Sequence, residues 1–142
     1  MDDSTVDAII QQMTADPWGW RYTLGGAGET FLKKPVSVNV QTRPFKQKDM
    51  PPEVNAGERR LLLRILADLH ALLSQAEDRF CKSNWFKHSA GHIASSEIWL
   101  NREVLEKNAD QWTLVVSRDD APDFGYHIEF NGSTFTRLWA GD

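Results

Sequence analysis

The middle of the chain carries the clearest periodic pattern, in which apolar residues recur every three or four positions and so share one face of a helix. Asn55 and Glu58 have the spacing of a capping box, and Ser83 and Asn84 weaken the helix at its other end. We therefore predict one long central helix that begins at Asn55 and ends near Lys82–Asn84. Its buried face would consist of Leu62, Ile65, Leu66, Leu69, Leu73, Ala76 and Phe80.

The C-terminal third alternates apolar and polar residues with the two-residue period of strands. Three such runs, "WTLVVS", "FGYHIEF" and "STFTRLW", predict an antiparallel meander. The pair Asn131-Gly132 between the last two is typical of a tight type I′ turn, which would set Phe130 opposite Ser133. This pairing places Phe124, Tyr126, Ile128, Phe130, Phe135 and Trp139 on the face toward the helix, and His127, Glu129, Thr134, Thr136 and Leu138 on the other face.

The N-terminal third shows shorter patterns. Helical spacing predicts a short helix from about Ser4 to Met13, and alternation predicts strands at Trp20–Leu24, Thr30–Lys33 and Val36–Val40. The glycine-rich stretch at residues 25–29 would join the first two of these strands into a hairpin.

A second short helix is predicted just before the meander, from about Asn101 to Asn108, whereas residues 84–100 show no clear pattern. The order of elements predicts an α+β fold. A single antiparallel sheet, built from the C-terminal meander and the N-terminal strands, would pack on one long central helix.

Composition narrows the class of protein without indicating an activity. A chain of 142 residues fits one domain, residues 1–142. Its net charge of −4 argues against nucleic-acid binding and is compatible with a basic protein partner. Cys81 is the only cysteine, the first residues lack a secretory pattern, and no apolar run approaches the roughly 20 residues of a membrane helix. A soluble cytoplasmic protein without membrane association is therefore expected.

The stretch "DDAPDFGYHIEF" near the C-terminus holds the best candidates for chemistry. His127 and Glu129 would lie two residues apart on the polar face of the sheet, where they could act as a base or as metal ligands. If that face is open to water, both are ordinary solvated strand residues, which is the simpler interpretation. The preceding Asp119, Asp120 and Asp123 are also common turn residues.

Three histidines could be combined into a zinc site. His88 and His92 have helical i, i+4 spacing and His127 would be a third ligand, but Gly91 lies between the first two and the glutamate of a zincin motif is missing. The letters Asp-Phe-Gly and "GGAGET" likewise lack the rest of a kinase or phosphate-loop motif. We therefore expect no metal and no cofactor.

Trp85 and Phe86, with His88 and His92 nearby, are the candidates for partner contact. They lie in the least regular segment, and tryptophan is a frequent interface anchor.

The leading hypothesis is a non-enzymatic binding or interaction domain, of which a protein-neutralising, immunity-type module is one concrete form. The alternative is a small enzyme or metal-dependent site that uses His127 and Glu129. A cavity for an apolar ligand between the sheet and the helix is a third possibility. The sequence does not predict an oligomeric state.

Overall fold

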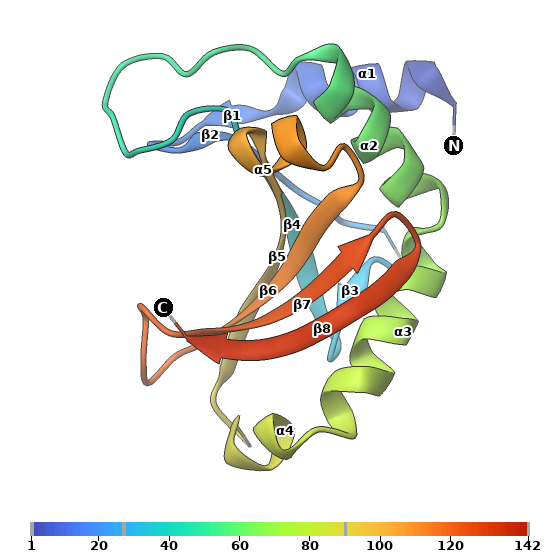
Figure 1. Cartoon of the computed structure of the whole chain (residues 1–142), viewed down its shortest axis with the longest axis vertical. Coiled ribbons are helices and arrows are strands. Elements are labelled where there is room, and N and C mark those ends of the chain that lie inside the picture. The colour runs from blue at the N-terminus through green and yellow to red at the C-terminus, as the bar shows by residue number, and fades with distance from the viewer. Residues whose placement is uncertain (1, 27, 90, 142) are drawn as a thin grey trace.

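The computed structural model describes residues 2–26, 28–89 and 91–141, and within them it contains five helices and eight strands (Figure 1). The sheet is mixed and mostly antiparallel, with the order β1-β2-β4-β5-β6-β7-β8, and β3 pairs with β4 beside this path. The predicted α+β class is confirmed at this level. The strands are β1 Thr14–Ala15, β2 Gly19–Thr23, β3 Thr30–Phe31, β4 Lys34–Gln41, β5 Ile93–Asn101, β6 Gln111–Arg118, β7 Gly125–Asn131 and β8 Thr134–Gly141. The helices are α1 Asp3–Gln12, α2 Ala56–Ala67, α3 Leu69–Cys81, α4 Asn84–Ser89 and α5 Arg102–Lys107.

A parallel pair, β4 and β5, forms the centre of the sheet, with Val38 opposite Ile98 and Val40 opposite Leu100. The chain passes through α2, α3 and α4 between these two strands, because parallel neighbours need a long crossover. The sequence predicts only antiparallel neighbours, so this pairing is a correction. It was missed because β5 lies in the segment, residues 84–100, that showed no clear pattern.

The prediction of a single long central helix is wrong in one respect, because the helix is divided into α2 and α3 at Asp68. This residue leaves the helical conformation (φ −118°, ψ 22°), and its N–H donates to Ile65 rather than four residues back. Aspartate is a weak helix former, and both halves still lie along the same face of the sheet (Figure 1). The capping box is confirmed by reciprocal 2.8 Å hydrogen bonds between Asn55 and Glu58, and the predicted apolar face is buried throughout.

The hairpin predicted between residues 20–24 and 30–33 is also wrong. Both segments form strands, but β2 and β3 each pair with β4 instead of with one another. A glycine-rich stretch shows that a tight turn is possible and does not select which strands it joins. Ala27, in this stretch, lies outside the described residues.

The turn from β3 to β4 has an unusual conformation for its residues. Leu32 and Lys33 both have positive φ, at 50° and 66°, which side chains of this size rarely adopt. The N–H of Leu32 donates to Glu77 of α3 at 3.1 Å, so the helix holds the turn in place.

The three C-terminal strands are confirmed, but the turn and register between β7 and β8 differ from the prediction. Asn131 pairs with Thr134, so the central turn residues are Gly132 and Ser133, and only Gly132 has positive φ (61°), as in a type II′ turn. A bulge then adds one residue, Thr136, to β8. Beyond it Ile128 lies opposite Leu138 and His127 opposite Trp139, which puts these two β8 residues on the faces opposite to those predicted.

The sheet has one covered and one open face. In Figure 1, α2 and α3 lie along one side of the strands, and the other side is free of them. The covered face carries buried Val36, Val38, Val40, Ile98, Leu100, Leu114, Val116, Tyr126, Ile128 and Phe130. The open face carries Arg21, Asn39, Gln41, Glu97, Trp99, Thr113, Val115, His127, Glu129, Arg137 and Trp139, as the strand register shows.

Among the described residues, no helix is both long enough and apolar enough to cross a membrane.

Candidate binding site on the open face of the sheet

The turn between β1 and β2 presents a tryptophan at the edge of the open face. Asp16 accepts hydrogen bonds from the N–H groups of Trp18 and Gly19, both at 2.8 Å, through Oδ1. Its Oδ2 accepts from Asn39 Nδ2 of β4 at 2.7 Å. These bonds tie the turn to the sheet and leave the Trp18 side chain 41% exposed.

A buried arginine also holds this turn, through hydrogen bonds to its backbone carbonyl oxygens. Arg43, only 6% exposed, donates from Nε to the carbonyl oxygen of Pro17 (2.9 Å) and from Nη2 to that of Asp16 (3.3 Å). It also donates to Gln47 O and to Asp49, through both the carbonyl and the side chain. One planar guanidinium thus joins the loop after β4 to the residues that precede Trp18, a geometry that lysine cannot reproduce.

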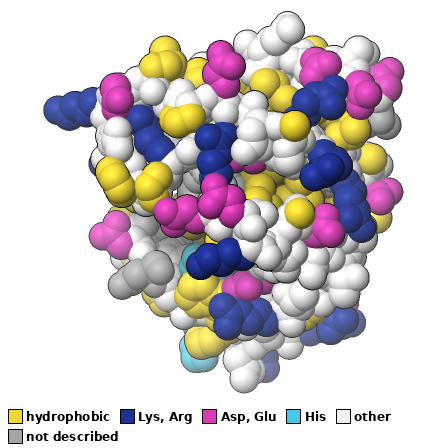
Figure 2. All heavy atoms as spheres, turned by 45° about the horizontal axis from the view of Figure 1, so that its top comes forward, with side chains coloured by type: hydrophobic (Ala, Val, Ile, Leu, Met, Phe, Trp, Pro, Cys, Tyr) yellow, Lys and Arg dark blue, Asp and Glu magenta, His cyan; other side chains and the backbone are white. Residues whose placement is uncertain are grey.

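A pocket of about 420 Å³ lies beside this turn, and we call it the tryptophan pocket. It contains two carboxylates and one guanidinium, and Arg21 Nη2 lies 2.7 Å from Glu97 Oε1. Figure 2 shows acidic and basic side chains interspersed over the visible surface. The pocket is therefore distinguished by its local contacts and not by a large surface region of one charge. Its lining consists of Asp16, Trp18, Arg21, Asn39, Gln41, Glu97 and Trp99.

The catalytic candidates lie farther along the open face, and His127 is not a solvated strand residue. It is 7% exposed because its ring stacks on Trp139, with centroids 3.9 Å apart and planes at 5°. The Trp99 ring lies nearly perpendicular to it, at 78°, with centroids 6.1 Å apart. This position of Trp139 follows from the bulge in β8. Burial holds the pKa of His127 below its ordinary value of 6.5, and Nε2 has no hydrogen-bond partner among the described residues.

Glu129 is held by three donors on its own face. Its carboxylate accepts from Arg137 Nε (2.9 Å), from Gln111 Nε2 (3.3 Å) and from Trp139 Nε1. A general base needs a lone pair that substrate can reach, whereas His127 is covered and Glu129 is engaged. The geometry therefore favours a packing role for the pair, and their catalytic role stays a prediction.

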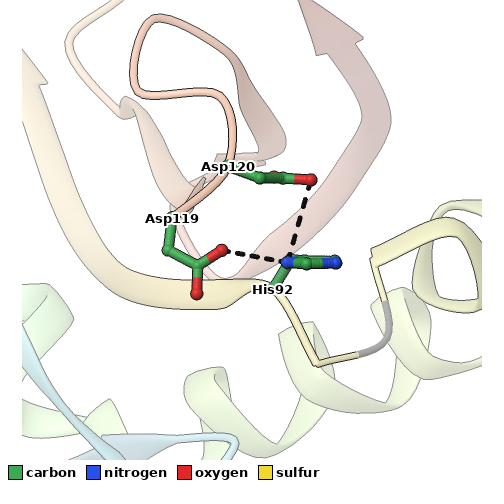
Figure 3. A group of neighbouring side chains, drawn as sticks. All are labelled: His92, Asp119 and Asp120. Atoms are coloured by element: carbon green, nitrogen blue, oxygen red, sulfur yellow. Dashed lines mark hydrogen bonds and ion pairs between the residues drawn. The ribbon is translucent and has the colours of Figure 1, made fainter.

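A second cluster joins the segment before β5 to the turn after β6. Figure 3 shows His92 facing Asp119 and Asp120, with its Nδ1 3.0 Å from Asp119 Oδ1 and 3.8 Å from Asp120 Oδ2. Arg118 binds both oxygens of Asp120, at 2.7 and 2.6 Å, and holds the pKa of that carboxyl below its usual range. A cation would have to compete with this guanidinium, and all three groups are exposed, so we interpret the cluster as a hydrogen-bonded turn.

The three predicted zinc ligands do not form one group. Among the described residues, the only cluster with suitable donor atoms is that of His92 with the two aspartates. α4 ends at Ser89, so His88 and His92 do not share a helix, and His127 is on the open face. The i, i+4 spacing was misleading because Gly91, with φ 80°, lies beyond the helix end.

The partner-contact candidates on α4 are divided by the structure. Trp85 is 39% exposed, whereas Phe86 packs against Phe80 with ring centroids 5.8 Å apart. His88 is exposed, and its carbonyl oxygen accepts from Arg118 Nη1 at 2.9 Å. Trp85 thus lies beside Tyr126 of the covered face, with ring centroids 6.3 Å apart, and Phe86 is half-buried against the core. A partner contact at Trp85 stays a prediction that is separate from the open face.

The residues of the tryptophan pocket were missed by sequence reasoning. The alternation in "VSVNVQ" places Asn39 and Gln41 on the polar side of their strand, which is a usable signal. Trp18 and Trp99 gave none, because only the parallel pairing of β4 with β5 brings the segments that carry them together.

Comparisons of the chain with protein-family models, curated proteins and solved structures found no match, so its function has to be inferred from the geometry of this site.

Proposed function

We propose that this protein is a non-enzymatic binding module of the cytoplasm that takes a protein partner on the open face of its sheet. The observation that carries the proposal is the tryptophan pocket, where Trp18 projects from an ordered turn beside Trp99. Exposed tryptophan next to a concavity is typical of the residues that dominate binding energy at protein interfaces.

The scaffold supports this role because the anchor is held before any partner arrives. Asp16 fixes the backbone of Trp18, and Arg43 fixes the residues before it. An anchor that is already ordered loses less conformational entropy on binding, so more of its contact energy contributes to affinity.

The overall charge supports a basic partner. At −4, the protein attracts a positively charged surface and repels nucleic acid, and long-range attraction of this kind raises association rates. A module that neutralises a basic protein, as an immunity-type protein does, is the concrete form that we propose.

The experiment is capture from native lysate with the tagged protein, followed by affinity measurement on the purified partner. Trp18→Ala and Trp99→Ala should each weaken binding by at least about 100-fold, the loss expected for an interface hot spot. Trp85→Ala is the matched control, because Trp85 is equally exposed but lies on α4, and it should bind as the wild type does.

Two results would contradict the proposal. One is a partner whose affinity is unaffected by both open-face variants while both variants remain folded. The other is failure to recover any partner, together with no neutralisation of a basic toxin encoded beside the gene. The enzymatic alternative has less support, because His127 is covered by Trp139 and Glu129 is engaged by three donors.

A further inference from the structure

We infer that the tryptophan pocket receives an arginine side chain of the partner. This inference rests on the proposed function and adds the chemistry of the group that the pocket recognises. The arguments are the aromatic lining, the balance of charge within the pocket, and the guanidinium that the pocket already binds.

Two indole rings line the pocket, and indole is the strongest of the aromatic side chains in attracting a cation to its face. Trp99 is held by its nearly perpendicular contact with His127, which is itself stacked on Trp139. Trp18 is fixed through its backbone by Asp16. A flat guanidinium can stack on a ring of this kind and still donate hydrogen bonds from its rim, which a lysine ammonium cannot do.

The charged groups of the lining favour a cation. Asp16 and Glu97 contribute two negative charges against the one positive charge of Arg21. Asn39 Nδ2 donates to Asp16 Oδ2 at 2.7 Å and to Trp20 O at 3.5 Å, so the amide hydrogens of this residue are engaged within the protein. A planar group with several N–H donors matches the two carboxylates better than an anion or an apolar group does.

Glu97 already binds one guanidinium, that of Arg21, at 2.7 Å. The Arg21 side chain is 43% exposed, so this ion pair contributes little and can be shared or exchanged. The intramolecular pair thus occupies part of the position that the partner's arginine would take. Removing the two members of the pair should therefore change the affinity for arginine in opposite directions.

The test uses a small probe, so that it does not require the partner. N-acetyl-arginine methylamide is titrated into the ¹⁵N-labelled protein, and the indole N–H signals of Trp18 and Trp99 are followed by NMR. The citrulline analogue, which has the same shape without the charge, is the matched probe. The arginine compound should shift both indole signals with a dissociation constant in the millimolar range, and the citrulline compound should bind at least about fivefold more weakly.

Three variants sharpen the result. Glu97→Gln should weaken binding of the arginine probe by about fivefold or more, and Arg21→Met should strengthen it by about threefold, since the competing guanidinium is gone. Trp85→Ala should leave the affinity unchanged. Because the Arg21 side chain is 43% exposed, Arg21→Met should fold, and its affinity for the arginine probe can be measured even if another variant is unstable.

Equal binding of the two probes, or no shift of either indole signal, would overturn the inference, as would weaker binding by Arg21→Met. The proposed function would fail separately. If the partner binds Trp18→Ala more weakly but the wild-type pocket does not bind the arginine probe, the proposed binding function would stand and the inference about arginine would be wrong.

Discussion

His127 shows how strongly neighbouring rings decide what a histidine can do. The sequence placed it on the polar side of a strand, which is correct, and its expected exposure followed from that side being wet. Trp139 opposite it and Trp99 beside it remove most of its contact with water. The identity of the strand face could be predicted from alternation, but the rings that cover it could not. Trp139 faces His127 only because of the bulge in β8, and Trp99 lies on β5, in the segment without a clear pattern.

The buried imidazole predicts a pH dependence of stability. Because the folded-state pKa lies below 6.5, the unfolded chain takes up a proton first as the pH falls. Stability should therefore be full above about pH 6.5 and should decline as the pH falls toward the folded-state pKa. The free energy of unfolding, measured by denaturant titration between pH 5 and pH 8, should fall less steeply in His127→Phe, which keeps a stacked ring without a titrating group.

The same expectation can be checked directly in the wild type. The NMR titration of the His127 ring should have its midpoint below 6.5. A midpoint at or above that value, or identical pH profiles for the wild type and His127→Phe, would contradict it.

At the scale of elements, the predictions succeeded where a pattern is local and failed where distant segments meet. The apolar face of α2 and α3, the cap at Asn55 and the strands of the meander all follow from spacing along the chain. The Leu32-Lys33 turn does not, because it adopts positive φ without glycine or asparagine and is held by a contact with α3. The helix break at Asp68 could not be predicted from the sequence either, because the apolar spacing continues across it.

The bulge at Thr136 gives a prediction at this scale. Phe130 pairs with Phe135 and Glu129 with Arg137, so deletion of Thr136 leaves a regular ladder with every side chain on its present face. The deletion should change the free energy of unfolding by less than about 1 kcal/mol, since it removes one hydrogen bond, from Thr136 Oγ1 to the carbonyl oxygen of Glu129.

Deletion of Leu138 is the matched comparison. It would turn Trp139 toward the covered face and abolish its stacking on His127, and the loss should exceed about 2 kcal/mol. Denaturant titration and the near-ultraviolet circular dichroism of tryptophan report both effects. A larger loss for the Thr136 deletion than for the Leu138 deletion would show that the bulge itself is required.

On the scale of the whole molecule, the parallel pair β4 and β5 joins two parts of the sheet that are each built from antiparallel neighbours. No local signal indicated this arrangement, since the pairing connects segments separated by the entire helical crossover. The tryptophan pocket lies on this junction, with residues from β2 and β4 on one side and from β5 on the other. For that reason, the α+β class could be predicted, whereas the parallel pairing and the site that lies on it could not.

This arrangement predicts where the molecule resists opening. The amides of β4, β5, β6 and β7 have strand neighbours on both sides, whereas β1 is a two-residue strand at the edge. Hydrogen–deuterium exchange should therefore be slowest in these four strands, by at least about 100-fold relative to β1 and residues 44–50. Faster exchange in β5 than in β8, the opposite edge strand, would contradict the assigned order.

The junction also has a consequence for synthesis on the ribosome. β4 emerges well before β5. One hydrogen-bonding edge of β4 therefore stays unpaired, and its apolar residues Val36, Val38 and Val40 lack their final neighbours, until the crossover and β5 have been translated. A nascent chain in this condition offers a site for chaperones, and for the same strand of a neighbouring nascent chain. Yield in the cell should then depend on the speed of translation and on chaperone supply more than on the stability of the finished protein.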